Sequence, residues 1–163
     1  MKRLLQSFAV ITAFAAATAP VQAACWDAAA FEAAQVRQLE TMLTAAAARC
    51  ETRSPAFAAH YGTFRAVNGA ALASAQARLQ RHFAGAGEGQ VFSASLATQA
   101  ASAARGLSCD DMAVLARIAA DSGGSVEALA RFASSADLRP QGGAETCRAE
   151  AVPIRIALNA SGQ

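Results

Sequence analysis

The sequence contains a single lysine, Lys2, and no basic run occurs beyond Arg3. The chain has 14 basic and 12 acidic residues. Lys2 and Arg3 are two of the basic residues, so beyond position 3 the remaining 12 arginines balance the 12 acidic residues. Nucleic-acid binding needs clustered positive charge for the phosphate backbone, and an anionic membrane surface attracts basic amphipathic segments. The sequence therefore predicts no nucleic-acid partner and no attachment to a membrane surface.

The sequence also lacks the short motifs that mark common catalytic and metal sites. It contains no C-x-x-C, no H-E-x-x-H and no G-x-S-x-G. Its two histidines, His60 and His82, lie about 33 Å apart by helical rise on one expected helix, so they cannot share a metal ion. The glycines of AGAGEGQ (84–90) follow a helix and lack the spacing of a dinucleotide loop. The sequence predicts no catalytic residue, no metal ligand and no cofactor.

The first 23 residues have the three-part pattern of a secretory signal peptide. A basic start at 2–3 is followed by an apolar, uncharged run at 4–19 and by small or branched residues before Ala23. The apolar run is short for a membrane span, which takes roughly 20 residues. We expect cleavage after Ala23, a periplasmic or secreted mature chain, and no stable membrane insertion after cleavage. Lipidation of Cys25 is a minor alternative, because Gln22 departs from the usual lipobox.

Beyond position 23, apolar residues recur every three or four positions, which predicts helices. The expected N-caps are Asp27, Ser54, Ser108 and Ser125, and Ser108 with Asp111 resembles a capping box. With prolines and glycines these residues bound five helices: from Asp27 to Cys50, from Pro55 to Phe83, over 92–105, from Ser108 to the DSGGS segment at 121–125, and a short one after Ser125. A flexible turn is expected over 84–90.

The expected fold class is all-α. It is an up-and-down bundle of four to five helices over 24–134, stapled by two disulfides. Residues 135–163 are expected to form a loop and an extended C-terminal arm that a disulfide closes. The arm alternates apolar and other residues from Val152 to Leu158, but Pro153 argues against a central strand.

Four cysteines in an exported chain predict two disulfides. Cys25 and Cys50 flank one expected helix, about 37 Å apart by helical rise, so they cannot bond each other. If the first three helices run alternately up and down, the third ends beside Cys50 and brings Cys109 there. This chain trace favours Cys50–Cys109 and Cys25–Cys147. The exchanged pairing, Cys25–Cys109 with Cys50–Cys147, stays open if the second and third helices cross steeply.

One polar side chain interrupts the apolar stripe of the second helix. Asn68 lies at helical spacing from Phe64 and Leu72, so we expect it to be buried and to need hydrogen-bond partners. The favoured interpretation is that it fixes the packing register against a neighbouring helix. The alternative is that Asn68 lines a ligand cavity together with His60 and Tyr61.

A family resemblance extends over the first two helices. The Cys-Trp pair at 25–26, the stretch VRQLETML with its later Arg-Cys, and the helix ending RLQRHF resemble small exported bacterial helical proteins of unknown function. The resemblance covers Cys25 to about Phe83 and implies no activity.

The sequence thus favours a non-catalytic, exported domain that supports the envelope or binds a partner, either a protein or a small molecule. The alternative is a small-ligand carrier or enzyme with a cavity near Asn68, His60 and Tyr61.

Overall fold

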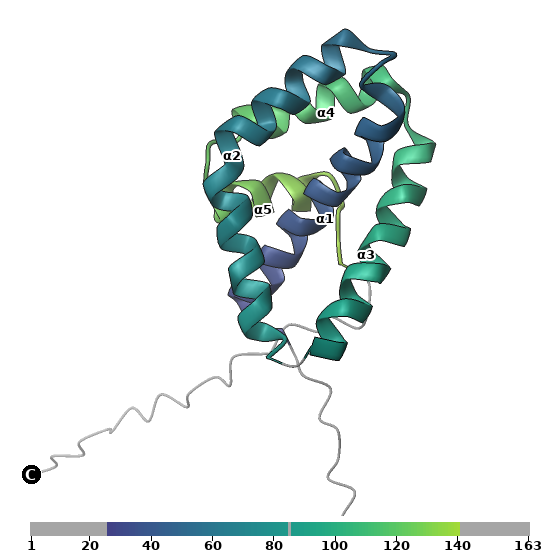
Figure 1. Cartoon of the computed structure of the whole chain (residues 1–163). Helices are drawn as coiled ribbons and strands as arrows, with labels where there is room; N and C mark the ends of the chain where they lie inside the picture. The colour runs from purple at the N-terminus through teal and green to yellow at the C-terminus, as the bar shows by residue number, and fades with distance from the viewer. Residues whose placement is uncertain (1–25, 85, 141–163) are drawn as a thin grey trace, which may run out of the picture.

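The computed structural model describes residues 26–84 and 86–140 of the chain. This part contains five helices and no strand, which confirms the all-α expectation (Figure 1). In chain order the helices are α1 (Ala28–Cys50), α2 (Pro55–His82), α3 (Ala86–Gly106), α4 (Cys109–Asp121) and α5 (Val126–Ser135).

Four helices begin at the capping residues that the sequence predicts. The side chains of Asp27, Ser54, Ser108 and Ser125 each accept a hydrogen bond from a backbone N–H in the first turn of α1, α2, α4 and α5. At α4 two hydrogen bonds join Ser108 and Asp111. The Ser108 hydroxyl accepts from the backbone N–H of Asp111, and the Asp111 carboxylate accepts from the backbone N–H of Ser108, both at 3.1 Å. Hydrogen bonds from the side chain and backbone of Ser108 hold the pKa of Asp111 below its usual value. Local sequence therefore sets where these helices begin.

α1 is the central helix of the fold. Its apolar stripe has no exposed surface and consists of Val36, Leu39, Leu43, Ala46 and Cys50. Two large side chains of α2, Phe57 and Phe64, complete the centre of the core, and both are fully buried. Alanines make up much of the remaining buried surface, so the helices pack through small side chains.

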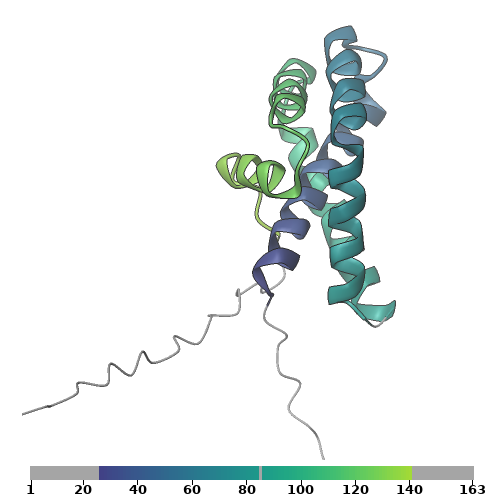
Figure 2. The ribbon, with the colours of Figure 1, turned by 90° about the vertical axis from the view of Figure 1, so that its left-hand side faces the viewer.

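The first three helices run alternately up and down the molecule, as expected for an up-and-down bundle (Figure 1). α4 packs on α2, whereas α5 lies across α1 (Figure 1, Figure 2). Arg78 of α2 helps to hold this crossing: its guanidinium is 2.8 Å from a carboxylate oxygen of Glu127 in α5 and 3.8 Å from one of Glu32 in α1. The hydrogen bond from Arg78 is also the main reason why the pKa of Glu127 lies below its usual value.

The flexible turn expected over 84–90 is largely wrong, because α3 begins at Ala86. Aromatic packing across the turn explains the difference. A Cβ placed on Gly89 would lie 3.4 Å from Cβ of Phe83, and the rings of Phe83 and Phe92 are 5.2 Å apart. This packing stabilises the first turns of α3 in spite of the low helix propensity of glycine.

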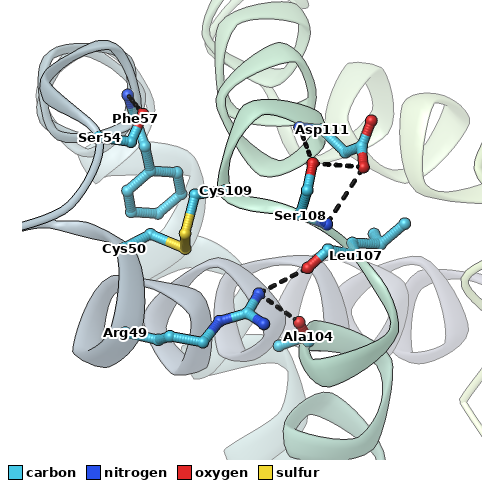
Figure 3. The surroundings of a disulfide bond; sticks show 9 residues. All are labelled: Arg49, Cys50, Ser54, Phe57, Ala104, Leu107, Ser108, Cys109 and Asp111. Carbon is cyan, nitrogen blue, oxygen red and sulfur yellow. Dashed lines mark hydrogen bonds between the residues drawn. A yellow bond between two sulfur atoms is a disulfide. The ribbon is translucent and has the colours of Figure 1, made fainter.

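One disulfide staples the end of α1 to the start of α4. The bond joins Cys50 and Cys109, whose Cα atoms are 5.4 Å apart (Figure 3). This confirms the favoured pairing for these two cysteines and shows that the exchanged pairing is wrong. Beside the bond, Arg49 donates to the backbone carbonyls of Ala104 and Leu107 at 2.6 and 2.7 Å, which ties the end of α3 to α1.

Several predictions concern residues outside the described part of the chain. They are the signal peptide over 1–23, the Cys25–Cys147 bridge, and most of the C-terminal arm. Within 26–84 and 86–140, no helix combines the length and the apolar character that crossing a membrane requires.

Candidate functional site

Asn68, the first of the three residues that the sequence singles out, is fully buried. Both the nitrogen and the oxygen of its side-chain amide form hydrogen bonds. Its Nδ2 donates to the carbonyl oxygens of Phe64 at 3.1 Å and of Ala119 in α4 at 3.3 Å. Its Oδ1 accepts from the backbone N–H of Gly124 at 3.2 Å. Gly124 has a φ of +53°, a backbone conformation that favours glycine. The amide thus joins α2 to α4 and to the turn after α4, as the register interpretation requires.

Tyr61 and His60 lie about two helical turns before Asn68. The half-buried Tyr61 ring stacks on Phe57, with ring centroids 5.6 Å apart, and its hydroxyl lies 3.1 Å from Oγ1 of Thr44. His60 is half-buried at the neighbouring position. None of the three residues lines the groove described next, and the cavity expected near them stays a prediction.

A groove of about 510 Å³ lies between the second half of α2 and the first half of α3, where α1 also contributes to its wall. This volume falls within the range of about 300–1,000 Å³ that small-molecule sites typically occupy. The lining residues are Arg37 and Thr41 of α1, Gln76, Leu79, Gln80 and Phe83 at the end of α2, and Gly89, Gln90, Phe92, Ser93 and Leu96 of α3.

The floor of the groove is apolar. Leu79 and Leu96 are buried, with 5% and 3% of their surface exposed, and Phe83 and Phe92 are half-buried beside them. Because these side chains belong to two helices that follow each other in the chain, the short turn between α2 and α3 brings them together. The floor therefore offers an apolar ligand a surface that is already packed.

On the α2 and α3 sides, the rim of the groove is polar and uncharged. Gln76 and Gln80 of α2 and Gln90 and Ser93 of α3 line it, and all four are exposed. A glutamine amide both donates and accepts hydrogen bonds, and a serine hydroxyl does the same. The rim is therefore suited to orient a ligand without requiring charge on it.

Arg37 is the one ionisable residue among the groove's lining residues. It forms an ion pair with Glu40 one turn further along α1, and Glu40 also lies 3.4 Å from Arg65 of α2. The Arg37 side chain remains 31% exposed, whereas that of Glu40 is 12% exposed. Because a guanidinium carries five N–H donors, Glu40 uses only part of the hydrogen-bonding capacity of Arg37.

Trp26, the single tryptophan of the chain, packs against two residues of the groove. Its ring centroid is 5.4 Å from that of Phe83 and 5.2 Å from that of Phe92, and it stacks on His82 at 4.5 Å. Trp26 is 7% exposed and does not line the groove itself. The surroundings of the Trp26 ring therefore change when either phenylalanine moves.

The sequence does not predict this groove. It predicts Phe83 only as the end of a helix and Gln90 only as part of a flexible turn. The one available signal is the spacing of polar residues, with Gln76 and Gln80 four positions apart on one face of their helix. That spacing does not reveal which neighbouring helix faces it.

The described residues contain no group of three or more His, Cys, Asp or Glu side chains that could hold a metal ion. Comparison of this chain with protein-family models, with curated proteins and with solved structures finds no match.

Proposed function

We propose that this protein is an exported, non-catalytic binding domain and that the groove between α1, α2 and α3 is its binding site. The observation that carries the proposal is the groove itself, about 510 Å³ in volume, with an apolar floor, polar side chains from α2 and α3, and one arginine, Arg37, from α1. A groove of this volume is typical of small-molecule sites, which occupy about 300–1,000 Å³.

The lining residues favour binding over catalysis. The hydroxyls of Thr41 and Ser93 are the nucleophiles among them, and Thr41 donates its hydroxyl proton to the carbonyl of Arg37 at 2.6 Å. A hydroxyl needs an adjacent general base, most often His or a carboxylate, to become an effective nucleophile. The groove lining contains no His, Cys, Asp or Glu, which supports a role in holding a ligand unchanged.

Two observations support export. The Cys50–Cys109 disulfide is typical of proteins that fold in an oxidising compartment outside the cytoplasm. The first 23 residues also match the pattern of a signal peptide. Together they favour the periplasm or the medium as the place where the groove meets its ligand.

Native mass spectrometry tests both parts of the proposal. The full chain is produced with its own N-terminus, recovered from the envelope fraction, and incubated with a small-molecule extract of that fraction. We expect the mass of a chain that begins at Ala24, together with a complex that carries one small molecule and dissociates on denaturation. A soluble cytoplasmic chain that retains Met1 would contradict export.

Two phenylalanine variants of α3 locate the binding site. Ser93 is exposed and lines the groove, so Ser93→Phe should fill the groove without disturbing the core. Ala97 is exposed on the same helix and does not line the groove, so Ala97→Phe adds the same side chain outside it. The complex should disappear in the first variant and persist in the second. Equal retention by both variants would rule out the groove as the site.

A further inference from the structure

We infer that the ligand of the groove is a small amphipathic monocarboxylic acid. Its carboxylate pairs with Arg37, and its apolar part lies against Leu79, Phe83, Phe92 and Leu96. The inference rests on the proposed function, because it names the class of ligand for the same groove.

The charges at the groove favour a single negative charge on the ligand. Arg37 and Arg65 share the carboxylate of Glu40, so these three side chains carry one net positive charge. A guanidinium binds a carboxylate through two parallel N–H···O bonds, a geometry that matches its planar fork. A cationic head group would be repelled by Arg37, and a phosphate monoester carries more negative charge than this cluster offsets.

The other lining residues favour an apolar body of limited length. Two leucines and two phenylalanines form the floor, and they gain most by contact with a hydrocarbon or aromatic group. Along α3 the lining extends from Gly89 to Leu96, about 10 Å at the rise of an α-helix. The groove therefore suits an acid of medium length, such as decanoate, better than a long lipid or a folded partner.

Three probes with the same tail test the charge of the head group: decanoate, decanol and decylamine. Binding to the oxidised mature protein is followed by calorimetry and by the fluorescence of Trp26, which packs on Phe83 and Phe92. Decanoate should bind at least about tenfold more tightly than decanol, because hydrogen bonds to a charged group contribute more than neutral ones. Decylamine should bind more weakly than decanol.

A matched pair of arginine variants assigns the preference to the groove. Arg37→Gln and Arg65→Gln each remove one guanidinium from Glu40, but only Arg37 lines the groove. Arg37→Gln should abolish the preference for decanoate over decanol, whereas Arg65→Gln should retain it. Arg37→Lys keeps the charge without the planar fork, so it should retain the sign of the preference with a smaller ratio.

The outcomes separate this inference from the proposed function. Equal affinity for decanoate and decanol, or equal loss of preference in the two arginine variants, would overturn the carboxylate assignment and leave the groove as a binding site. Failure of decanoate to bind would also overturn the assignment. Decanoate binding that survives Ser93→Phe would overturn both proposals. The head-group comparison uses the unmodified protein, so it decides the question even if Arg37→Gln does not fold.

Discussion

At the scale of single residues, Asn68 connects three parts of the fold through one side chain. Ala119 lies in the last turn of α4, and its carbonyl accepts from the backbone N–H of the C-cap residue Ser122 at 3.4 Å and from Asn68 at 3.3 Å. Gly124 lies in the turn between α4 and α5, and its N–H donates to Oδ1 of Asn68. The side chain thus anchors the corner between α4 and α5 onto α2.

Replacing Asn68 with leucine should destabilise the protein. Leucine has similar volume but removes the hydrogen bonds of the amide to Ala119 and Gly124, and two such bonds at about 0.5–1.5 kcal/mol each contribute about 1–3 kcal/mol. The free energy of unfolding, measured by urea titration, should fall by that amount. Val67→Leu, at an exposed neighbouring position, is the control and should change stability little. Unchanged stability in Asn68→Leu would show that the amide contributes no net hydrogen bonding to the fold.

The sequence was sufficient to predict that Asn68 is buried but not to identify its partners. Burial follows from the spacing of Phe64, Asn68 and Leu72, which is a local property of one helix. The two hydrogen-bond partners of Asn68 outside α2 lie 51 and 56 positions away, so they depend on where α4 ends and how it packs. The helix caps, in contrast, are predictable from local sequence. Ser108 and Asp111 lie within one helical turn of each other, so their contact does not depend on how the helices pack.

At the scale of elements, α3 is held by few buried side chains. Leu96, Ala100 and Ala104 are the buried residues that it contributes to the core, and it packs mainly on α1. Its C-terminal end is tied to α1 by Arg49, which donates to two backbone carbonyls near the Cys50–Cys109 bond (Figure 3). The groove depends on this helix, because five of its eleven lining residues come from α3.

Arg49→Met should therefore loosen α3 more than the other helices. Methionine retains much of the apolar stem of arginine but removes the guanidinium, so the carbonyls of Ala104 and Leu107 lose a charged donor, a loss of about 1.5–3 kcal/mol. Amide hydrogen exchange should accelerate most in the last turns of α3. Arg53→Met, which removes an exposed arginine from the next turn of the chain, is the matched control. Similar acceleration in both variants would mean that the lost charge, and not the capping contact, is responsible.

The start of α3 also shows where prediction from local sequence fails. Glycines at 87 and 89 predict a turn by propensity, and propensity alone gives no helix there. The helix forms because Gly89 packs on Phe83 and because the ring of Phe92 contacts Phe83 and Trp26. These contacts are tertiary, so they override the local preference, and they also create the apolar floor of the groove.

At the scale of the whole molecule, the expected directions of the helices are more informative about the disulfide pairing than any sequence motif. Alternating directions for the first three helices favour a bond between Cys109 and Cys50 over the exchanged pairing, and the structure confirms that bond. The crossing of α5 over α1 and the angle between α2 and α3 were not predictable, because both follow from the shapes of packed side chains. The groove depends on that angle, so the sequence does not reveal the groove although it favours the Cys50–Cys109 bond.

The Cys50–Cys109 bond should contribute a large part of the stability of this alanine-rich fold. It closes a loop of 59 residues, and loop entropy assigns such a closure about 4 kcal/mol, against a typical total of 5–15 kcal/mol for a domain. In the double variant Cys50→Ala/Cys109→Ala, the free energy of unfolding should fall by about 2–4 kcal/mol. The dependence of that free energy on urea should become steeper, because the unfolded chain without the crosslink exposes more surface. Non-reducing peptide mapping of the unmodified protein is the control and should show the Cys50–Cys109 peptide. A variant whose urea midpoint and slope match those of the unmodified protein would show that helix packing alone, chiefly around α1, stabilises the fold.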